Sequence, residues 1–309
     1  MSFLLRFRAV LVLLAVLPLS ACLFRSRKVE QPINAAQLRT ATQQELIDYI
    51  NTQAAKIQTM QATVDIDTSV GGVKKGKVTD YQEIRGYVLA RKPAMLRLIG
   101  LMPIVRNRAF DMVSDGKTFK LWIPPKNRFV VGRNDIETHD AVKPLENLRP
   151  QHLYDALLLR SIDPQSEIAV MESDTELVSD SKGHKVERAD YVIDVIDKGD
   201  HGSFLSRKIE FSRADLLPHR QLLYDENGNI ATNALYGNYK DDHGVNFPWQ
   251  IEIARPQEEY DITLNIVKLD LNQSLPDDKF TLEQPAGAEV VHLDQPQASS
   301  SAAPPGSNR

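Results

Sequence analysis

Residues 61–72 read QATVDIDTSVGG, and from Gln61 onward the sequence has a period of two. Apolar and polar residues alternate there, Ala62, Val64 and Ile66 against Thr63, Asp65 and Asp67. This alternation is typical of a strand with one buried and one solvated face. The Gly-Gly pair that follows predicts a turn into a second strand at about 81–90.

The same pattern recurs along the chain. We predict further strands at about 95–99, 108–113, 118–123, 128–132, 167–171, 191–197, 204–211, 218–224, 230–239, 247–253 and 260–271. Turn residues such as Ser114-Asp115-Gly116 and Asn227-Gly228 separate several of them. Because helices do not alternate with the strands, we expect a mainly β fold with one large curved antiparallel sheet, not a parallel βαβ fold.

Two stretches have helical spacing instead. At about 42–60, Thr42 and Glu45 match a capping box and apolar residues recur every three or four positions. At about 145–159, Pro150 suits the first turn of a helix, and Leu153 and Leu157 mark an apolar face. These helices are the elements available to cover the sheet. The sequence therefore predicts a curved sheet with a helical lid that encloses an apolar cavity.

The chain begins MSFLLRFRAVLVLLAVLPLSAC, residues 1–22. Two arginines precede an apolar run that ends in small residues, which indicates a secretory signal, too short and wrongly flanked for a spanning helix. The ending Leu19-Ser20-Ala21-Cys22 resembles the lipobox of bacterial lipoproteins. That resemblance implies cleavage between Ala21 and Cys22 and acylation of Cys22, for example with palmitate. The alternative is an ordinary signal with a chance cysteine.

We therefore expect four regions. These are a signal peptide at 1–21, the lipidated Cys22 with a flexible tether at 22–40, a half-barrel domain at 41–293, and a disordered tail rich in Pro, Ser and Ala at 294–309. The tether carries Arg25, Arg27 and Lys28, which either form part of a solvated linker or contact anionic lipid headgroups.

Composition excludes several classes of protein. The net charge is −4 and charges of both signs are mixed, so the basic footprint of a nucleic-acid-binding protein is missing. Cys22 is the single cysteine, which excludes an intrachain disulfide and a cysteine-rich metal site. After the signal, no apolar run reaches the roughly 20 residues of a membrane-spanning helix.

No motif predicts catalysis, a metal site or a cofactor. GGVKKGKV at 71–78 has most of a phosphate-binding loop, but Val78 stands where magnesium needs Ser or Thr, and the predicted context is strand-turn-strand. The seven histidines lack the close spacing of metal ligands, and no Gly-x-Ser-x-Gly elbow is present. We therefore expect a protein that is not an enzyme.

Residues 100–105, GLMPIV, are apolar where a polar turn is expected between two strands. Leu101, Met102 and Ile104 either pack back onto the barrel or form an exposed apolar lip that touches lipid or a ligand. Trp122 and Trp249, at strand ends, present the same alternatives, with core packing favoured.

Short motifs in this order resemble the LolA/LolB group of bacterial lipoprotein carriers. They are Arg85-Gly86, residues 92–98 (KPAMLRL), residues 113–117 (VSDGK), and residues 275–280 (LPDDKF) with Pro285 and Gly287. The resemblance spans most of 42–291. It implies an incomplete barrel, closed by helices, whose cavity holds acyl chains of lipoproteins or related lipids.

The lipobox makes the chain more similar to the outer-membrane acceptor of that group than to its soluble shuttle. The resemblance implies a lipid anchor in the outer membrane facing the periplasm, with a periplasmic carrier protein as a partner. The acceptor has an exposed Leu on a protruding loop, for which Leu101 is the possible counterpart. The shuttle fastens its lid with an Arg, for which Arg85 and Arg97 are both candidates.

Our interpretation is binding without covalent catalysis. Inward-facing apolar residues are expected to line a cavity beneath the first helix and to hold an acyl chain: Leu96, Leu98, Phe110, Phe119, Leu121, Ile193, Phe211 and Ile262. The competing hypothesis is a structural or interaction lipoprotein of an envelope assembly, with no transferable ligand.

Overall fold

The computed structural model describes residues 38–74, 76–135, 149–179, 183, 185–199 and 202–293. The chain divides into two compact units, Met1–Ala36 with Leu177–Glu187, and Gln37–Glu176 with Arg188–Arg309. The core, helices and hollows described below belong to the second unit. Ala21, Cys22 and the tail after 293 lie outside the described residues, and no described helix combines the length and apolar character needed to cross a membrane.

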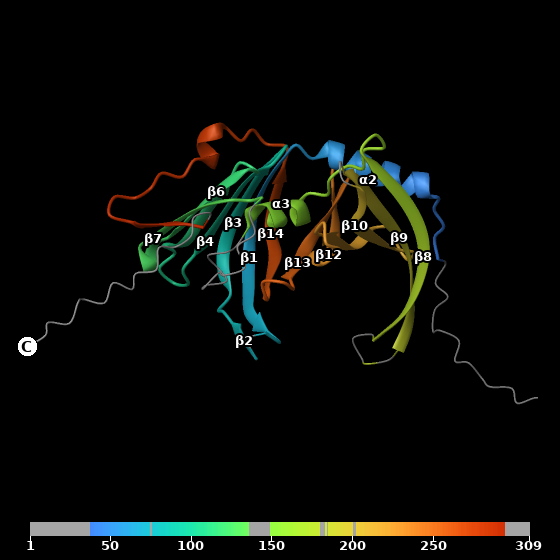
Figure 1. Ribbon diagram of the computed structural model, residues 1–309, viewed down its shortest axis with the longest axis horizontal. Helices are drawn as coiled ribbons and strands as arrows, with labels where there is room; N and C mark the ends of the chain where they lie inside the picture. The colour runs from blue at the N-terminus through green and yellow to red at the C-terminus, as the bar shows by residue number, and fades with distance from the viewer. Residues whose placement is uncertain are drawn as a thin grey trace, which may run out of the picture. The chain divides into compact units, whose positions relative to one another are not determined.

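The described strands occupy most of the second unit (Figure 1). The first group comprises β1 (Thr59–Gly72), β2 (Lys77–Asp80), β3 (Ile84–Arg91), β4 (Met95–Leu101), β5 (Arg108–Ser114), β6 (Thr118–Ile123) and β7 (Arg128–Arg133). The second group comprises β8 (Glu167–Ser179), β9 (Lys185–Gly199), β10 (Gly202–Ser212), β11 (Pro218–Tyr224), β12 (Ile230–Asp242), β13 (Val245–Arg255), β14 (Tyr260–Leu271) and β15 (Glu289–His292).

These strands form one sheet, in the order β15-β7-β6-β5-β4-β3-β1-β14-β13-β12-β11-β10-β9-β8, with β2 paired to β1. The printed pairings are antiparallel, except that β15 runs parallel to β7. The two groups meet at a seam where β1 pairs with β14, from Met60 opposite Leu271 to Val70 opposite Tyr260. The predicted mainly β fold with a large antiparallel sheet is confirmed.

One face of the sheet is apolar across both groups. A single cross-strand row runs through directly paired residues on seven neighbouring strands: Ile193, Ile209, Gln221, Ala234, Ile253, Ile262 and Thr68. A second row joins Val88, Leu98, Met112, Leu121 and Val130. Because side chains alternate between faces, these rows place the predicted inward-facing residues on one side of the sheet.

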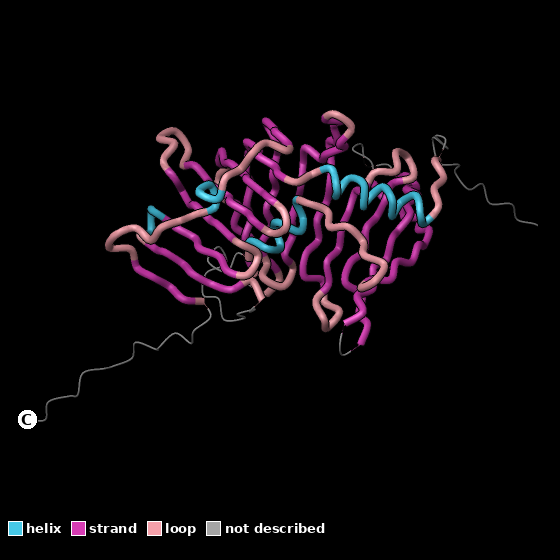
Figure 2. The backbone as a smooth tube through the Cα atoms, turned by 90° about the horizontal axis from the view of Figure 1, so that it is seen from above, coloured by secondary structure: helices cyan, strands magenta, loops and turns pink. Residues whose placement is uncertain are grey.

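Two helices cover this face (Figures 1 and 2). Helix α2 (Gln43–Lys56) begins at the predicted capping box, in which the Thr42 amide donates to Glu45 Oε2 at 2.7 Å. It ends before the predicted position because β1 already begins at Thr59. Its Leu46 and Ile50 share a buried cluster with Ile193 and Phe211.

Helix α3 (Pro150–Leu157) lies against β4, β5, β12 and β13. The first part of the predicted 145–159 helix falls outside the described residues. Leu153, Tyr154 and Leu157 are buried in the same cluster as Leu96 and Leu98 of β4. Tyr236 Oη donates to the Ala156 carbonyl at 2.9 Å, which joins the helix to β12.

The opposite face of β3–β7 is covered by the segment that follows β14. Leu275 and Phe280, the latter at the end of the 3₁₀ turn η3 (Asp277–Phe280), pack on Leu89, and Leu282 packs on Val113 and Phe129. This C-terminal segment, residues 275–292, ends in β15 at the edge of β7. Because this segment covers the outer face, the face covered by the helices is the side on which a ligand cavity can form.

Candidate ligand-binding cavity

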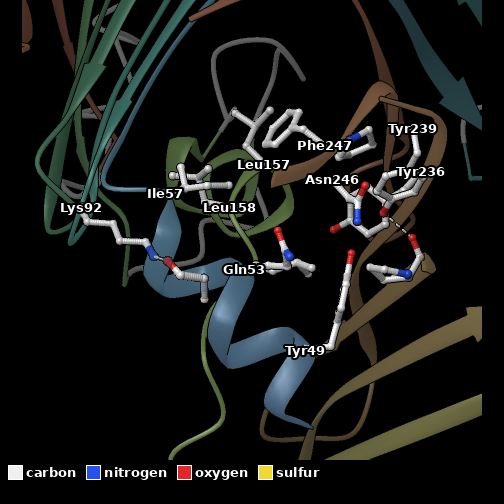
Figure 3. Close-up of a pocket in the computed structure, with 14 residues that line it drawn as sticks. Tyr49, Gln53, Ile57, Lys92, Leu157, Leu158, Tyr236, Tyr239, Asn246 and Phe247 are labelled. Atoms are coloured by element: carbon white, nitrogen blue, oxygen red, sulfur yellow. Dashed lines mark hydrogen bonds between the residues drawn. The ribbon is translucent and has the colours of Figure 1, made fainter. Parts of the chain in front are cut away.

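The hollow beneath α2 is small (Figure 3). It measures about 30 Å³, and Tyr49 and Gln53 of α2 point into it opposite Tyr236 and Asn246. A cavity needs roughly 10–15 Å³ per water, so this space suits water and not a lipid chain. The neighbouring part of the face is filled, because Leu46 and Ile50 pack there against Ile193 and Phe211.

A cavity of about 370 Å³ lies elsewhere on the same face, over β1, β3–β6 and β14. This volume is within the roughly 300–1,000 Å³ range of small-molecule sites. Its deepest residues are less than 5% exposed: Ile66, Leu98, Leu121 and Ile262. Ile84, Phe110 and Ile123 continue the apolar wall toward the opening. We expected the cavity beneath the first helix, whereas this larger one lies over the other group of strands.

Two glycines leave room for the side chains that line this cavity. Gly86 and Gly100 are directly paired on β3 and β4. A Cβ at Gly100 would lie 2.4 Å from Cε1 of Phe110 and 2.8 Å from Cδ1 of Ile84, and one at Gly86 would lie 2.5 Å from Cδ1 of Ile66. Real Cβ atoms do not approach this closely, so the two glycines allow these lining side chains to lie flat against the strands.

The polar lining residues come from β1 and from connections between strands. Thr68 belongs to β1, Tyr81 and Gln82 connect β2 to β3, and Lys126 belongs to the 3₁₀ turn η2 (Pro124–Lys126) between β6 and β7. Tyr81, Gln82 and Lys126 are exposed. The cavity is therefore apolar inside and polar at its opening, and its lining contains a lysine but no carboxylate.

An apolar loop leads into one strand of the cavity wall. It connects β4 to β5, and Ala109 and Phe110, which follow it, line the cavity. Ile104 is fully exposed, Val105 is 61% exposed and Met102 is 37% exposed. Ile104 has φ of +68°, which is unfavourable for a β-branched residue. Met102, Ile104 and Val105, the apolar lip, thus project to solvent; Leu101 belongs to β4 and is only partly buried.

Helix α3 carries ionisable groups inside the half-barrel. Burial lowers the pKa of His152 to about 3, and the positive charges of Arg255 and Arg149 add to the effect. Burial raises the pKa of Asp155 to about 6, although Gln151 Nε2 donates to its Oδ1 at 2.8 Å and opposes the shift. His152 is therefore uncharged at neutral pH, and neither group lines the cavity.

The structure divides the predicted cavity residues into three sets. Leu98, Phe110, Leu121 and Ile262 line the 370 Å³ cavity, and Leu96 and Phe119 are buried in the core beside it. Ile193 and Phe211 lie beneath α2 in a separate cluster. Ile66 and Ile84 also line the cavity and were detectable, since both continue the alternation of their strands.

Neither candidate lid arginine faces a helix. Arg85 Nε bonds Asp65 at 2.6 Å, and Arg97 binds Asp111 through two nitrogens, at 2.9 and 2.7 Å. Arg97 Nη1 also donates to the Lys279 carbonyl at 2.9 Å. Both arginines lie on the face opposite the helices. Arg97 therefore holds the C-terminal segment in place and does not fasten a lid.

Other predicted features have local roles. Of the residues 71–78, Gly71, Gly72, Lys77 and Val78 belong to the paired strands β1 and β2, and Trp122 is partly buried beneath the C-terminal segment. Trp249 is partly buried and packs against the core, and Lys240 Nζ lies 3.4 Å from the centre of its ring. Within the described ranges, no three His, Cys, Asp or Glu side chains gather as a metal site would require.

No protein-family model matches the sequence, and no curated protein matches it. Among solved structures, a LolA superfamily protein from Nitrosomonas europaea is 14% identical, covering 79% of this chain and 99% of its own, with a TM-score of 0.47. A DUF1329 family protein from Desulfovibrio piger is 14% identical, covering 77% and 95%, with a TM-score of 0.49. An outer membrane lipoprotein-sorting protein domain from Vibrio parahaemolyticus is 14% identical, covering 76% and 94%, with a TM-score of 0.46. These three solved structures are proteins to which the chain is similar at 14% sequence identity.

Proposed function

We propose that this protein binds an acyl chain of a lipoprotein or another lipid in the 370 Å³ cavity and acts in lipoprotein localisation or lipid transfer. The observation that carries the proposal is the apolar interior, with eight apolar lining residues and polar groups confined to β1 and the strand connections. Removing apolar surface from water stabilises a complex by about 0.8 kcal/mol per buried CH₂. The site needs no covalent chemistry to perform this role.

The position of the apolar lip supports the same function. Met102, Ile104 and Val105 are exposed and shortly precede the lining residues Ala109 and Phe110 in the chain, so an acyl chain that leaves a membrane next to them would have a short path to the cavity. Lipidation of Cys22 would hold the domain at the periplasmic side of the outer membrane. Acylation, the membrane and the carrier partner are parts of the proposal that the sequence motifs support.

The direct test is the affinity of the purified full chain for saturated fatty acids of 8 to 16 carbons, measured by calorimetry after delipidation. The affinity should rise with chain length until the cavity is full. Ile84→Phe should weaken binding by reducing the cavity, whereas Ile168→Phe, on exposed β8, should leave it unchanged. An affinity that does not change with chain length would contradict the proposal.

The lip can be tested separately, by flotation of the full chain with Cys22 replaced by Ser on phospholipid vesicles. Ile104→Asp should reduce vesicle binding, because it places a charge where apolar contact is expected. The matched control is Leu235→Asp, since Leu235 is 41% exposed on β12. Equal loss for both variants would show that the lip has no special part in membrane contact. An empty cavity in protein purified with stoichiometric protein partners would instead favour a structural lipoprotein.

A further inference from the structure

We infer that the cavity selects single-chain amphiphiles with an anionic head, which Lys126 binds at the opening while the acyl chain occupies the apolar interior. This inference rests on the proposed function and extends it from the acyl chain of the ligand to its head group. The first observation is the charge of the cavity lining, which, among the residues that the structure describes, contains the ammonium of Lys126 and no carboxylate.

The second observation is the lack of a partner for Lys126. No hydrogen bond or ion pair joins its side chain to another described residue. By contrast, Lys92, Lys198 and Lys208, on other parts of the sheet, each bond a carbonyl or a carboxylate. An ammonium on a flexible stem without a partner can turn toward an anion without first breaking a bond within the protein.

The third observation is that the backbone under Lys126 is held in place. Pro124 and Pro125 restrict the turn, and Asn127, at φ of +50°, donates its backbone N–H to the Pro124 carbonyl at 3.0 Å. The Asn127 side chain also donates to the Gly287 carbonyl in the C-terminal segment at 2.9 Å. Only the side chain of Lys126 must therefore be ordered when a ligand binds, which lowers the entropic cost.

Two further polar side chains suit the same head group. Tyr81 and Gln82 line the opening and present a hydroxyl and an amide, both of which can donate to oxygen. The Tyr81 backbone is fixed by its N–H, which donates to the Thr68 carbonyl at 2.9 Å. A carboxylate or a phosphate accepts several such bonds at once and carries a negative charge, whereas a hydroxyl or an ester head offers the ammonium only a neutral and weaker acceptor.

The test compares four ligands that share a 16-carbon chain: palmitate, hexadecanol, and the palmitoyl forms of lysophosphatidic acid and lysophosphatidylcholine. Affinities are measured by calorimetry on the full chain after delipidation. Lys126→Met keeps the apolar stem and removes the charge, Lys126→Arg keeps the charge, and Lys77→Met removes a nearby exposed charge outside the lining.

The wild type should prefer an anionic amphiphile to hexadecanol, and Lys126→Met should lose about five- to tenfold in affinity for that amphiphile alone, the size expected of one charge-assisted bond at an exposed site. Lys126→Arg should restore binding, and Lys77→Met should bind like the wild type. Loss confined to palmitate would identify a carboxylate head, and loss confined to lysophosphatidic acid would identify a phosphate head.

Equal affinities of wild type and Lys126→Met for all four ligands would overturn the head-group inference and leave the proposed function intact. An equal loss in Lys77→Met would also overturn it, because general attraction would then explain the preference. Failure of the wild type to bind any of the four would instead count against the acyl-chain cavity itself.

Discussion

Gly86 and Gly100 show how single residues control the size of the cavity. Both lie at paired positions of neighbouring strands, where a residue without a side chain weakens packing. The structure explains both glycines, because the side chains of Ile66, Ile84 and Phe110 occupy the positions where their Cβ atoms would lie. We expect substitutions at these glycines to affect ligand binding directly.

Gly100→Ala is the simplest such substitution. The new methyl would press on the Phe110 ring and on Ile84, so we expect a loss of stability of about 1–3 kcal/mol and weaker binding of long acyl chains. Urea unfolding and calorimetry measure the two effects. Gly237→Ala is the control, because the nearest atoms at that strand position are 3.8 and 3.9 Å away. Similar effects at both sites would show that strand glycines matter only through the backbone.

Ile104 combines full exposure with a left-handed backbone conformation. Ile104→Gly should raise the melting temperature, by an amount equivalent to about 1 kcal/mol, because glycine adopts positive φ without steric cost. The same variant should bind vesicles less well than the wild type. A fall in melting temperature would mean that Ile104 makes stabilising contacts, contrary to its exposure.

At the scale of elements, the C-terminal segment acts as a cover for the outer face of β3–β7. Phe280 is 6% exposed, and the guanidinium carbon of Arg91 lies 5.0 Å from its ring centre. Arg91 Nη1 also donates to the Leu275 carbonyl at 2.6 Å, and Arg97 holds Lys279. The segment therefore combines apolar packing with arginine contacts to its backbone carbonyls.

Phe280→Ala should destabilise the protein by about 2–4 kcal/mol, since it removes the largest side chain of a small buried cluster. Amide hydrogen exchange should show earlier loss of protection in β15 and β7 than in β9–β13. Ile168→Ala, at an exposed position of β8, should change stability by less than about 0.5 kcal/mol. Unchanged protection of β15 would mean that its pairing with β7 holds the segment by itself.

Helix α3 is the element from which we expect a measurable pH dependence. The folded His152 binds a proton only near pH 3, whereas the unfolded chain binds one near 6.5, so His152 lowers stability as the pH falls below 6.5. Asp155 acts in the opposite direction, because the folded state takes up its proton near pH 6 and the unfolded chain near 3.8. The two contributions oppose each other between about pH 6 and 4.

Single substitutions should separate the contributions of His152 and Asp155 to stability. Between pH 7 and 5, Asp155→Asn should lose stability relative to the wild type and His152→Asn should gain it, each on the order of 1 kcal/mol, as measured by urea unfolding. Parallel curves for all three proteins would contradict the assigned shifts.

At the scale of the whole molecule, long strands with one buried face could be predicted from sequence. The predicted bounds of β6, β11 and β14 match the structure, and in β6 and β14 the alternation of buried and exposed residues is clear. β8 extends well beyond its predicted end, since 172–177 are exposed and have no buried face to create a period. β2 and β15 could not be predicted, because four residues are too few to show a period of two. In addition, β15 pairs with β7, which is far away in sequence.

The same physical limit applies to the candidate site. Leu98, Phe110, Leu121 and Ile262 could be predicted because they continue the pattern of buried strands. Tyr81, Gln82 and Lys126 come from connections, where side-chain direction follows no period, so only the folded chain brings them together. That the cavity avoids α2 depends on how Leu46 and Ile50 pack, which no local pattern reveals.

The seam between β1 and β14 has a consequence for how the chain assembles in time. Its partners are roughly 200 residues apart, whereas β3–β7 and β9–β13 pair with near neighbours in sequence. Because closing long loops is slow, the two meanders should form first and the seam last, with folding in the millisecond-to-second range or slower. Until then β1 and β14 present open edges to other chains, so the middle of the finished sheet is the part most exposed to aggregation during folding.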